Sequence, residues 1–318
     1  MTTRVLLAGA AGETAGRHHQ RDMFAPGIAA SPLLVVCGVW SGPDGADGYG
    51  RAGELAASLD VPLVDDVRAA LAGADAVVAC LDPDALEVLL DSLPDTNPAA
   101  PVLLDKAVLL GTDRLAALGQ DPRAARLVAA YHSRFHPGIV TLTGIVRSGE
   151  LGLPHALHGE LVVPFGDGPT PEGDLRHVGI LALDAVAAVL GPPGGDVHAV
   201  RTASGDPATE AWTLTVRWHP GVVVTLLVSR GQPGGTAMLH RYRLMGSEGQ
   251  ILVDLAAPAV RVLGEAALVG YGPGPVQLEL ETLARGGSGT SMTDLAALSR
   301  LVDAAEWSAG DGRVHPLG

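Results

Sequence analysis

Residues 4–16 read Arg4-Val-Leu-Leu-Ala-Gly9-Ala-Ala-Gly12-Glu-Thr-Ala-Gly16, an apolar run that leads directly into closely spaced glycines. The run predicts a buried strand at 4–8, followed by a helix at 13–24. Glycines let a backbone approach a pyrophosphate, and a helix N-terminus offers unpaired N–H groups to phosphates. The spacing departs from Gly-x-Gly-x-x-Gly, because Ala11 replaces the second glycine and the third comes later. The stretch therefore predicts a dinucleotide-binding turn, with a simple tight turn as the alternative.

Similar apolar runs recur along the first 130 residues, each followed by an Ala- and Leu-rich stretch typical of a helix. Expected strands are 4–8, 33–40, 62–64, 76–81, 102–104 and 126–130, and expected helices are 13–24, 50–59, 67–71, 84–92 and 112–118. Alternating strands and helices with short connections predict an α/β domain built on a parallel, doubly wound sheet.

After about residue 130 the pattern changes to two helical segments and a series of alternating polar and apolar runs. Pro and Gly turns separate these runs, which is typical of antiparallel strands. Expected helices are 136–148, 175–190 and 293–309, and expected strands are 213–219, 222–229, 237–245, 250–256, 260–263 and 276–281. The sequence thus predicts a dinucleotide-binding domain over 1–130 and an α+β domain over 131–318.

The composition limits the class of protein. A formal net charge of −14 argues against a nucleic-acid backbone or an anionic membrane as partner. Cys37 and Cys80 lie inside apolar runs, which favours buried thiols in a reducing compartment over a disulfide. The first apolar run is too short for a signal peptide, and none reaches the ~18–20 residues of a membrane span. We expect a globular, cytoplasmic protein.

Lysine and arginine together number 21, and Lys106 is the only lysine among them. It stands just past the apolar run at 102–104, beyond the expected end of a strand. Arginine can replace lysine on a solvated surface, but a guanidinium cannot give up its proton near neutral pH. Lys106 is therefore a candidate acid/base group, and a surface lysine without a special role is the alternative.

The second strand ends at Trp40-Ser41, and no carboxylate follows until Asp44. A carboxylate there would bind the ribose 2′-hydroxyl of NAD. Ser41 and a nearby arginine such as Arg51 could instead accept the 2′-phosphate of NADP. This favours NADP slightly over NAD, and a solvent-facing loop without a cofactor role is the alternative.

Several motifs together resemble one family. Leu103-Leu-Asp105-Lys106-Ala107 resembles its Glu-Lys-Pro signature, and similarity continues through Tyr131-His-Ser-Arg134-Phe-His-Pro137, 148–152, 173–191 and 306–310. The chain is similar over nearly its whole length to the glucose-fructose oxidoreductase / inositol dehydrogenase / MocA-like (Gfo/Idh/MocA) oxidoreductases. The resemblance implies a Rossmann domain followed by an open-faced, mainly antiparallel sheet that often forms a dimer surface. It also implies reversible hydride transfer between a nicotinamide and a sugar, polyol or related carbonyl compound.

The resemblance extends to single residues. In the family, the lysine that matches Lys106 lies beside the nicotinamide and the reacting hydroxyl, and the turn that matches Leu81-Asp82 lies against the cofactor. With the glycine turn and the end of the second strand, the expected cofactor-binding residues are Gly9, Ala11, Gly12, Thr14, Trp40, Ser41, Leu81, Asp82 and Lys106. The expected substrate-binding residues are His132, Arg134 and Asp184, although a structural ion pair is equally compatible with Arg134.

One helix departs from the family pattern. Where the family has Asp-x-Gly-x-His-x-x-Asp, this chain reads His177-Val-Gly-Ile-Leu181-Ala-Leu-Asp184. Positions 177, 181 and 184 share one face of an α-helix, so the imidazole on that face lies one turn toward the N-terminus. His177 is then either a catalytic acid/base that lines the cleft beside Lys106 or an ordinary residue at a helix start. Asp105 and Ala107 also loosen the surroundings of the lysine.

We expect an NAD- or NADP-dependent dehydrogenase or reductase of a small hydroxylated, sugar- or polyol-like compound, with Lys106 and His177 as catalytic residues. The alternative is a dinucleotide-binding sensor or accessory protein with little catalysis, because His177 and Leu181 replace the Asp and His of the signature helix. We expect a homo-oligomer, a dimer or tetramer formed through the C-terminal sheet. The paired histidines at 18–19 and at 155 and 158 lack zinc-site spacing, so no metal site is expected.

Overall fold

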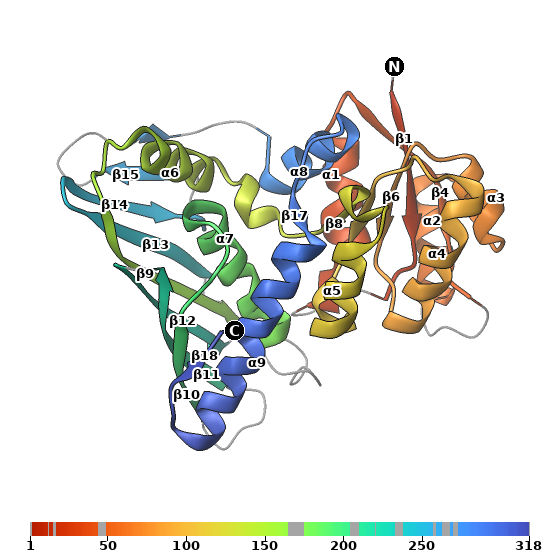
Figure 1. The fold of residues 1–318 in the computed structure, drawn as a ribbon. Coiled ribbons are helices and arrows are strands. Elements are labelled where there is room, and N and C mark those ends of the chain that lie inside the picture. The colour runs from red at the N-terminus through yellow and green to blue at the C-terminus, as the bar shows by residue number, and fades with distance from the viewer. Residues whose placement is uncertain are drawn as a thin grey trace. The chain divides into compact units, whose positions relative to one another are not determined.

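A computed structural model describes residues 2–11, 13–14, 17–43, 49–164, 175–203, 210–219, 221–232, 238–256, 259–262, 268–269 and 273–317. Gly12, one of the expected cofactor-binding residues, lies outside these ranges, and Thr14 is described by its backbone alone. The chain divides into two compact units (Figure 1). The first unit comprises Met1–His132 and Pro273–Thr293, and the second comprises Ser133–Gly272 and Asp294–Gly318.

The sheet of the first unit has seven strands among the described residues, in the order β17-β8-β7-β6-β1-β4-β5. They are β1 (Thr3–Ala8), β4 (Leu34–Trp40), β5 (Leu63–Val64), β6 (Ala76–Ala79), β7 (Val102–Leu104), β8 (Leu127–Ala129) and β17 (Thr290–Ser291). All neighbouring pairs are parallel except β17 with β8. Strand order reverses at β1, which has β4 on one side and β6 on the other. The predicted doubly wound sheet is confirmed.

Helices join successive strands of this sheet: α1 (Ala25–Ala29), α2 (Tyr49–Leu59), α3 (Val67–Ala72), α4 (Pro83–Thr96) and α5 (Thr112–Gln120). Side-chain caps begin two of them. Asp66 accepts a hydrogen bond of 2.7 Å from Ala69 N, and Asp82 accepts one of 2.8 Å from Ala85 N. Such caps satisfy amide groups that a helix start leaves unpaired. These two caps fix where α3 and α4 begin.

The first helix starts later than predicted. Residues 13–18 hold the short antiparallel strands β2 (Glu13–Thr14) and β3 (Arg17–His18), and a π-helical turn (η1, Gln20–Phe24) leads into α1. Asp22 accepts a hydrogen bond of 2.9 Å from His18 N and thereby stabilises the later start.

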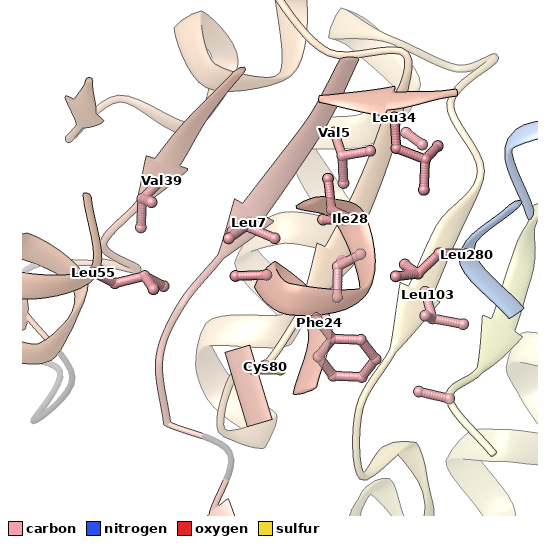
Figure 2. Close-up of a cluster of buried hydrophobic side chains, with 14 of the residues drawn as sticks. Val5, Leu7, Phe24, Ile28, Leu34, Val39, Leu55, Cys80, Leu103 and Leu280 are labelled. Atoms are coloured by element: carbon pink, nitrogen blue, oxygen red, sulfur yellow. The ribbon is translucent and has the colours of Figure 1, made fainter. Parts of the chain in front are cut away.

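A hydrophobic core holds this unit together (Figure 2). Val5 and Leu7 of β1 alternate with residues of the opposite face, and they meet Phe24 and Ile28 from the helical segment after the glycines. Leu280 reaches the same cluster from much later in the chain. The helix that contributes it lies beside α1 (Figure 1).

That late helix corrects a prediction. The expected strand at 276–281 is the helix α8 (Pro275–Ala284). Its sequence alternates polar and apolar residues, which resembles a strand. Pro275 stands at the first helical position, and Leu280 and Leu283 are both buried at a helical spacing of three. Packing against the first unit overrides the local pattern.

The second unit is built on a sheet with nine strands in the part of the chain that the structure describes, in the order β16-β15-β14-β13-β9-β12-β11-β10-β18. They are β9 (Pro154–Pro164), β10 (Asp196–Ala203), β11 (Glu210–His219), β12 (Val222–Gln232), β13 (Leu239–Gly246), β14 (Gly249–Asp254), β15 (Ala259–Val262), β16 (Leu268–Val269) and β18 (His315–Pro316). The helices are α6 (Pro137–Ser148), α7 (Ile180–Leu190) and α9 (Met292–Asp311), the last of which begins in the first unit. Neighbouring strands are antiparallel except β9 with β12, so the predicted sheet type is confirmed.

Among the described residues, one face of this sheet is exposed. Along β11, Trp212, Leu214 and Val216 are buried, while the intervening Thr213 and Thr215 are exposed. Apolar side chains of the other strands also reach solvent on this unit: Val200, Val223 and Leu239 are 49%, 42% and 38% exposed. The expected open-faced sheet is confirmed.

Candidate functional site

The turn after β1 is held between the ends of two neighbouring strands. Gly9 N donates a hydrogen bond of 2.8 Å to Trp40 O, and Ala11 N donates one of 3.0 Å to Cys80 O. The turn therefore lies at the carboxyl edge of the sheet, at the point where strand order reverses. In open α/β sheets, ligands bind in the crevice at this position.

Gly9 is required by the geometry of this turn. Its φ is +73°, and an added Cβ would lie 2.3 Å from Leu81 Cδ2 and 2.6 Å from Cys80 O. A residue with a side chain would strain the backbone and collide with the next strand end. The absence of a side chain at Gly9 lets the turn pack directly against Cys80 and Leu81 at the end of the next strand.

The end of β4 offers less to a ligand than the sequence suggested. Trp40 is buried, and its indole Nε1 donates a hydrogen bond of 3.1 Å to Asp65 O. Ser41 is buried as well, and its hydroxyl donates to Gly42 O at 3.2 Å. Both side chains are held by the protein itself.

A pocket of about 210 Å³ lies beside the turn, and its lining includes Ala10, Gln20, Arg21, Arg51 and Leu55. Gln20 is fixed by a hydrogen bond of 2.8 Å from its Nε2 to Val78 O. Arg21 and Arg51 line the pocket together with the carboxylate of Glu54, and Arg21 forms an ion pair of 2.7 Å with Asp22. The charge at the pocket is therefore mixed.

Lys106 follows β7 at the same edge. Its φ is +52°, a left-handed conformation that residues with a Cβ rarely adopt. Leu109 N donates a hydrogen bond of 3.0 Å to Lys106 O, which starts the short helix η2 (Ala107–Leu110). The preceding residue, Asp105, is buried and forms an ion pair with His19 across 2.6 Å. Leu81 and Asp82 occupy the neighbouring edge position, where Leu81 packs beneath Gly9 and Asp82 caps α4.

In the second unit, Arg134 and Asp184 bind each other. The guanidinium of Arg134 donates two hydrogen bonds to the carboxylate, of 2.6 and 3.0 Å, and Asp184 is 0% exposed. Tyr242 lies nearby, and burial together with the Asp184 carboxylate raises the pKa of its hydroxyl well above the usual value. The structural ion pair that the sequence left open is present.

His177 does not stand in an uninterrupted α-helix. It belongs to a π-helical turn (η5, Leu175–Gly179) that precedes α7, so the assumed spacing of one face over 177, 181 and 184 does not hold there. The imidazole is buried, with 8% of the residue exposed. The adjacent Arg176 binds Asp303 and Glu306 of α9, which fixes this turn.

The expected residues thus fall into two groups. Gly9, Ala11, Trp40, Ser41, Leu81, Asp82 and Lys106 lie at one sheet edge of the first unit, which also contains His132, and Arg134, His177 and Asp184 belong to the second unit. Among the described residues, no group of three or more His, Cys, Asp or Glu side chains could hold a metal ion. The described helices include none long and apolar enough to cross a membrane.

Solved structures share this architecture. The myo-inositol dehydrogenase of Corynebacterium glutamicum is 20% identical, with a TM-score of 0.77 over 100% of this chain and 99% of its own. An Agrobacterium radiobacter oxidoreductase, solved with NAD+, L-tartaric acid and magnesium, has a TM-score of 0.79 at 16% identity, over 100% and 99%. A levoglucosan dehydrogenase solved with NADH and L-sorbose reaches 0.80 at 15%, over 100% of both chains. The chain has the Gfo/Idh/MocA oxidoreductase fold. No protein-family model and no curated protein matches the sequence.

The fold implied by the sequence motifs is therefore confirmed, whereas two features of the candidate site are not predicted from the sequence. The first is the pair of His19 and Asp105, which are 86 positions apart. The His18-His19 doublet after the glycines was noted only as an unsuitable metal site. The second is the buried environment of Cys80, which follows β6 and approaches Asp105. His19, Cys80 and Asp105 come together because β1, β6 and β7 are neighbours in the sheet and end at the same edge.

Proposed function

We propose that the protein is an NAD(P)-dependent dehydrogenase or reductase that acts on a small hydroxylated compound of the sugar or polyol class. The observation that carries this proposal is the placement of the single lysine at the same sheet edge as the Gly9 turn. The solved structures with this fold include an inositol dehydrogenase and a levoglucosan dehydrogenase, the latter with NADH bound. Their activities support the proposal for this chain.

The dinucleotide fits the first unit. The turn that contains Gly9 and Ala11 would lie against the pyrophosphate, because it stands at the carboxyl edge of the sheet where strand order reverses. Arg51 lies in the pocket beside the turn, with Glu54 and the Asp22-bound Arg21 in the same lining. With no carboxylate at the Trp40-Ser41 end of β4, we favour NADP slightly over NAD, and Arg51 is our choice to bind the 2′-phosphate.

When bound, the nicotinamide supplies the hydride acceptor or donor. Lys106 would handle the proton of the reacting hydroxyl, accepting it during oxidation and returning it during reduction. Its position beyond β7 keeps the side chain at the ligand-binding edge of the sheet. Asp105 beside it and the short helix after it hold the turn in place.

The second unit would contribute the substrate groups. We propose that His177 lines the site and assists Lys106 with the proton, and that His132 contacts the substrate. Arg134 and Asp184 already satisfy each other, so we assign them to shaping the substrate site as a rigid pair. His177→Ala should then lower kcat more than it weakens dinucleotide binding; an unchanged rate would remove His177 from the mechanism.

We further propose that the protein is a cytoplasmic homo-oligomer. Cys37 and Cys80 are free thiols, which suits a reducing compartment. The open sheet face carries exposed Val223 beside polar residues such as Thr213 and Thr215, a mixture that a second copy of the chain can cover. Light scattering coupled to size exclusion tests this, and a monomer at micromolar concentration would refute it.

The function is tested by incubating the protein with NAD+ or NADP+ and a panel of sugars, polyols and anhydrosugars while following formation of the reduced nicotinamide. At least one compound should be oxidised, and Lys106→Arg should lower turnover by roughly 10²–10⁴. Lys106→Arg keeps the charge but removes the ability to exchange a proton. Normal turnover by this variant would overturn the role of Lys106. Binding of a dinucleotide without turnover of any compound would favour the sensor alternative.

A further inference from the structure

A buried ion pair stands directly beside the lysine turn. His19 Nδ1 and Asp105 Oδ2 lie 2.6 Å apart, and their side chains are only 5% and 8% exposed. A carboxylate is rarely this buried without a compensating partner. His19 begins the helical segment after the glycine turn, and Asp105 immediately precedes Lys106. The pair therefore joins the two parts of the chain to which the proposed function assigns the pyrophosphate and the proton transfer.

Asp105 is also fixed to the strand between these two parts. Its backbone N donates a hydrogen bond of 2.8 Å to Ala79 O at the end of β6. Cys80 directly follows Ala79. Burial, and after it the Asp105 carboxylate, raises the pKa of the Cys80 thiol well above its usual value, while the Lys106 ammonium opposes this shift. The charges of Asp105 and Lys106 thus both act on the Cys80 thiol. The carboxylate is the common partner of His19, Cys80 and the lysine turn.

The backbone of Lys106 needs such an anchor. A φ of +52° costs free energy for a lysine, and a strained residue persists only where its surroundings determine its conformation. On one side the turn is held by Asp105 and its ion pair. On the other side, Leu109 N donates to Lys106 O at 3.0 Å. Strained residues held in this way are found at functional sites.

The charge of the pair also bears on the lysine. A carboxylate close to an ammonium favours the protonated amine. The ionisable groups that the described residues of the first unit place at these strand ends include His18, His19, Cys80, Asp82, Asp105, Tyr131 and His132. Asp82 is engaged with Ala85 N as a helix cap, and Asp105 directly adjoins the lysine. Asp105 is therefore the nearest negative charge along the chain.

We propose that Asp105 and His19 are positioning residues for Lys106: their ion pair fixes the left-handed lysine turn to the start of the glycine-turn helix and sets the charge beside the lysine amine. This inference rests on the proposed function for its catalytic meaning. The ion pair and its effect on the lysine turn do not depend on any substrate. Asp105 stands where the family has Glu. The proposal gives Asp105 a partner, His19, and the role of positioning Lys106.

The single lysine makes a direct test possible. Biosynthetic labelling with ¹³C,¹⁵N-lysine gives one set of side-chain signals, from Lys106, whose titration NMR can follow without substrate. Asp105→Asn removes the neighbouring negative charge, so the midpoint of the Lys106 titration should fall by about one pH unit, a tenfold change in proton affinity. His19→Ala should move the Lys106 signal, and Asp105→Glu should restore the wild-type midpoint more closely than Asp105→Asn does.

Asp121→Asn is the matched control, because Asp121 forms an ion pair with Arg123 in the same unit and away from the lysine turn. It should leave the Lys106 signals unchanged. Circular dichroism confirms that each variant is folded. Unchanged Lys106 signals in folded Asp105→Asn and His19→Ala would overturn the proposal.

Activity separates this inference from the proposed function. With a substrate in hand, Asp105→Asn should lower kcat by about ten- to a hundredfold while changing KM for the dinucleotide less than threefold, because the variant disturbs the proton step. A wild-type protein that binds no dinucleotide would refute the proposed function while the NMR result still decides the ion pair's role. Equal losses in kcat and dinucleotide binding would reduce the pair to a folding role and overturn the inference.

Discussion

Replacement of Gly9 by alanine tests the turn on which dinucleotide binding depends. The backbone φ of +73° would cost an alanine roughly 1–2 kcal/mol. The new Cβ would also lie 2.6 Å from Cys80 O, a backbone atom that cannot move without disturbing β6, and 2.3 Å from Leu81 Cδ2. Overpacking of this kind typically adds 1–3 kcal/mol. We expect Gly9→Ala to lower the free energy of unfolding by about 2–5 kcal/mol.

Gly286→Ala is the matched control. Gly286 belongs to the same unit and has a φ of +72°, but nothing lies within 4 Å of an added Cβ. It should cost roughly 1–2 kcal/mol, from the backbone alone. Urea unfolding followed by circular dichroism gives both values, and calorimetry with NADH and NADPH measures binding. Gly9→Ala should also abolish dinucleotide binding, whereas Gly286→Ala should not. Equal destabilisation by the two substitutions would refute the close approach of this turn to β6.

Three further predictions concern stability, each measured by urea unfolding. Lys106→Gly should be more stable than Lys106→Ala by about 1 kcal/mol, because glycine adopts a φ of +52° without strain; the reverse order would contradict the left-handed turn. Arg134→Ala should cost about 3–5 kcal/mol, because it removes the guanidinium that binds the buried Asp184 carboxylate, and adding Asp184→Leu should recover part of the loss. The Arg123 guanidinium lowers the pKa of Asp121 from 3.8 to about 2, so this carboxylate stabilises the fold above its unfolded-state pKa and loses that effect as pH falls through about 2. Asp121→Asn should therefore cost about 1 kcal/mol at neutral pH, after allowance for solvent screening, and no more than the measurement error near pH 2.

Much of the first unit is predictable from sequence because parallel strands are buried on both faces. The run at 102–104 is apolar throughout, and β7 occupies those residues. Where local pattern and tertiary packing disagree, prediction fails. The alternating residues of 276–281 indicate a strand, but Leu280 and Leu283 form α8 because that helix packs onto α1.

The candidate site shows a similar division. Gly9 and Lys106 are predictable because their residue types carry the signal: a glycine where the backbone must approach closely, and the only lysine of the chain. The partners of these residues are not predictable in the same way. His19 and Asp105 are 86 positions apart, and Arg134 and Asp184 are 50 apart. Such pairs depend on strand register and on how a helix packs, which a single sequence does not encode in any local pattern.

The central claim is that Lys106 exchanges the substrate proton beside a bound nicotinamide. The distance from Lys106 Nζ to nicotinamide C4 in a crystal structure of the NADH or NADPH complex tests it most directly. A hydroxyl within hydrogen-bond reach of the amine, on a carbon in position for hydride transfer, requires this distance to be within about 5 Å. We expect that distance in the complex. A nicotinamide that lies on another edge of the sheet, with Lys106 turned into solvent, would contradict the claim.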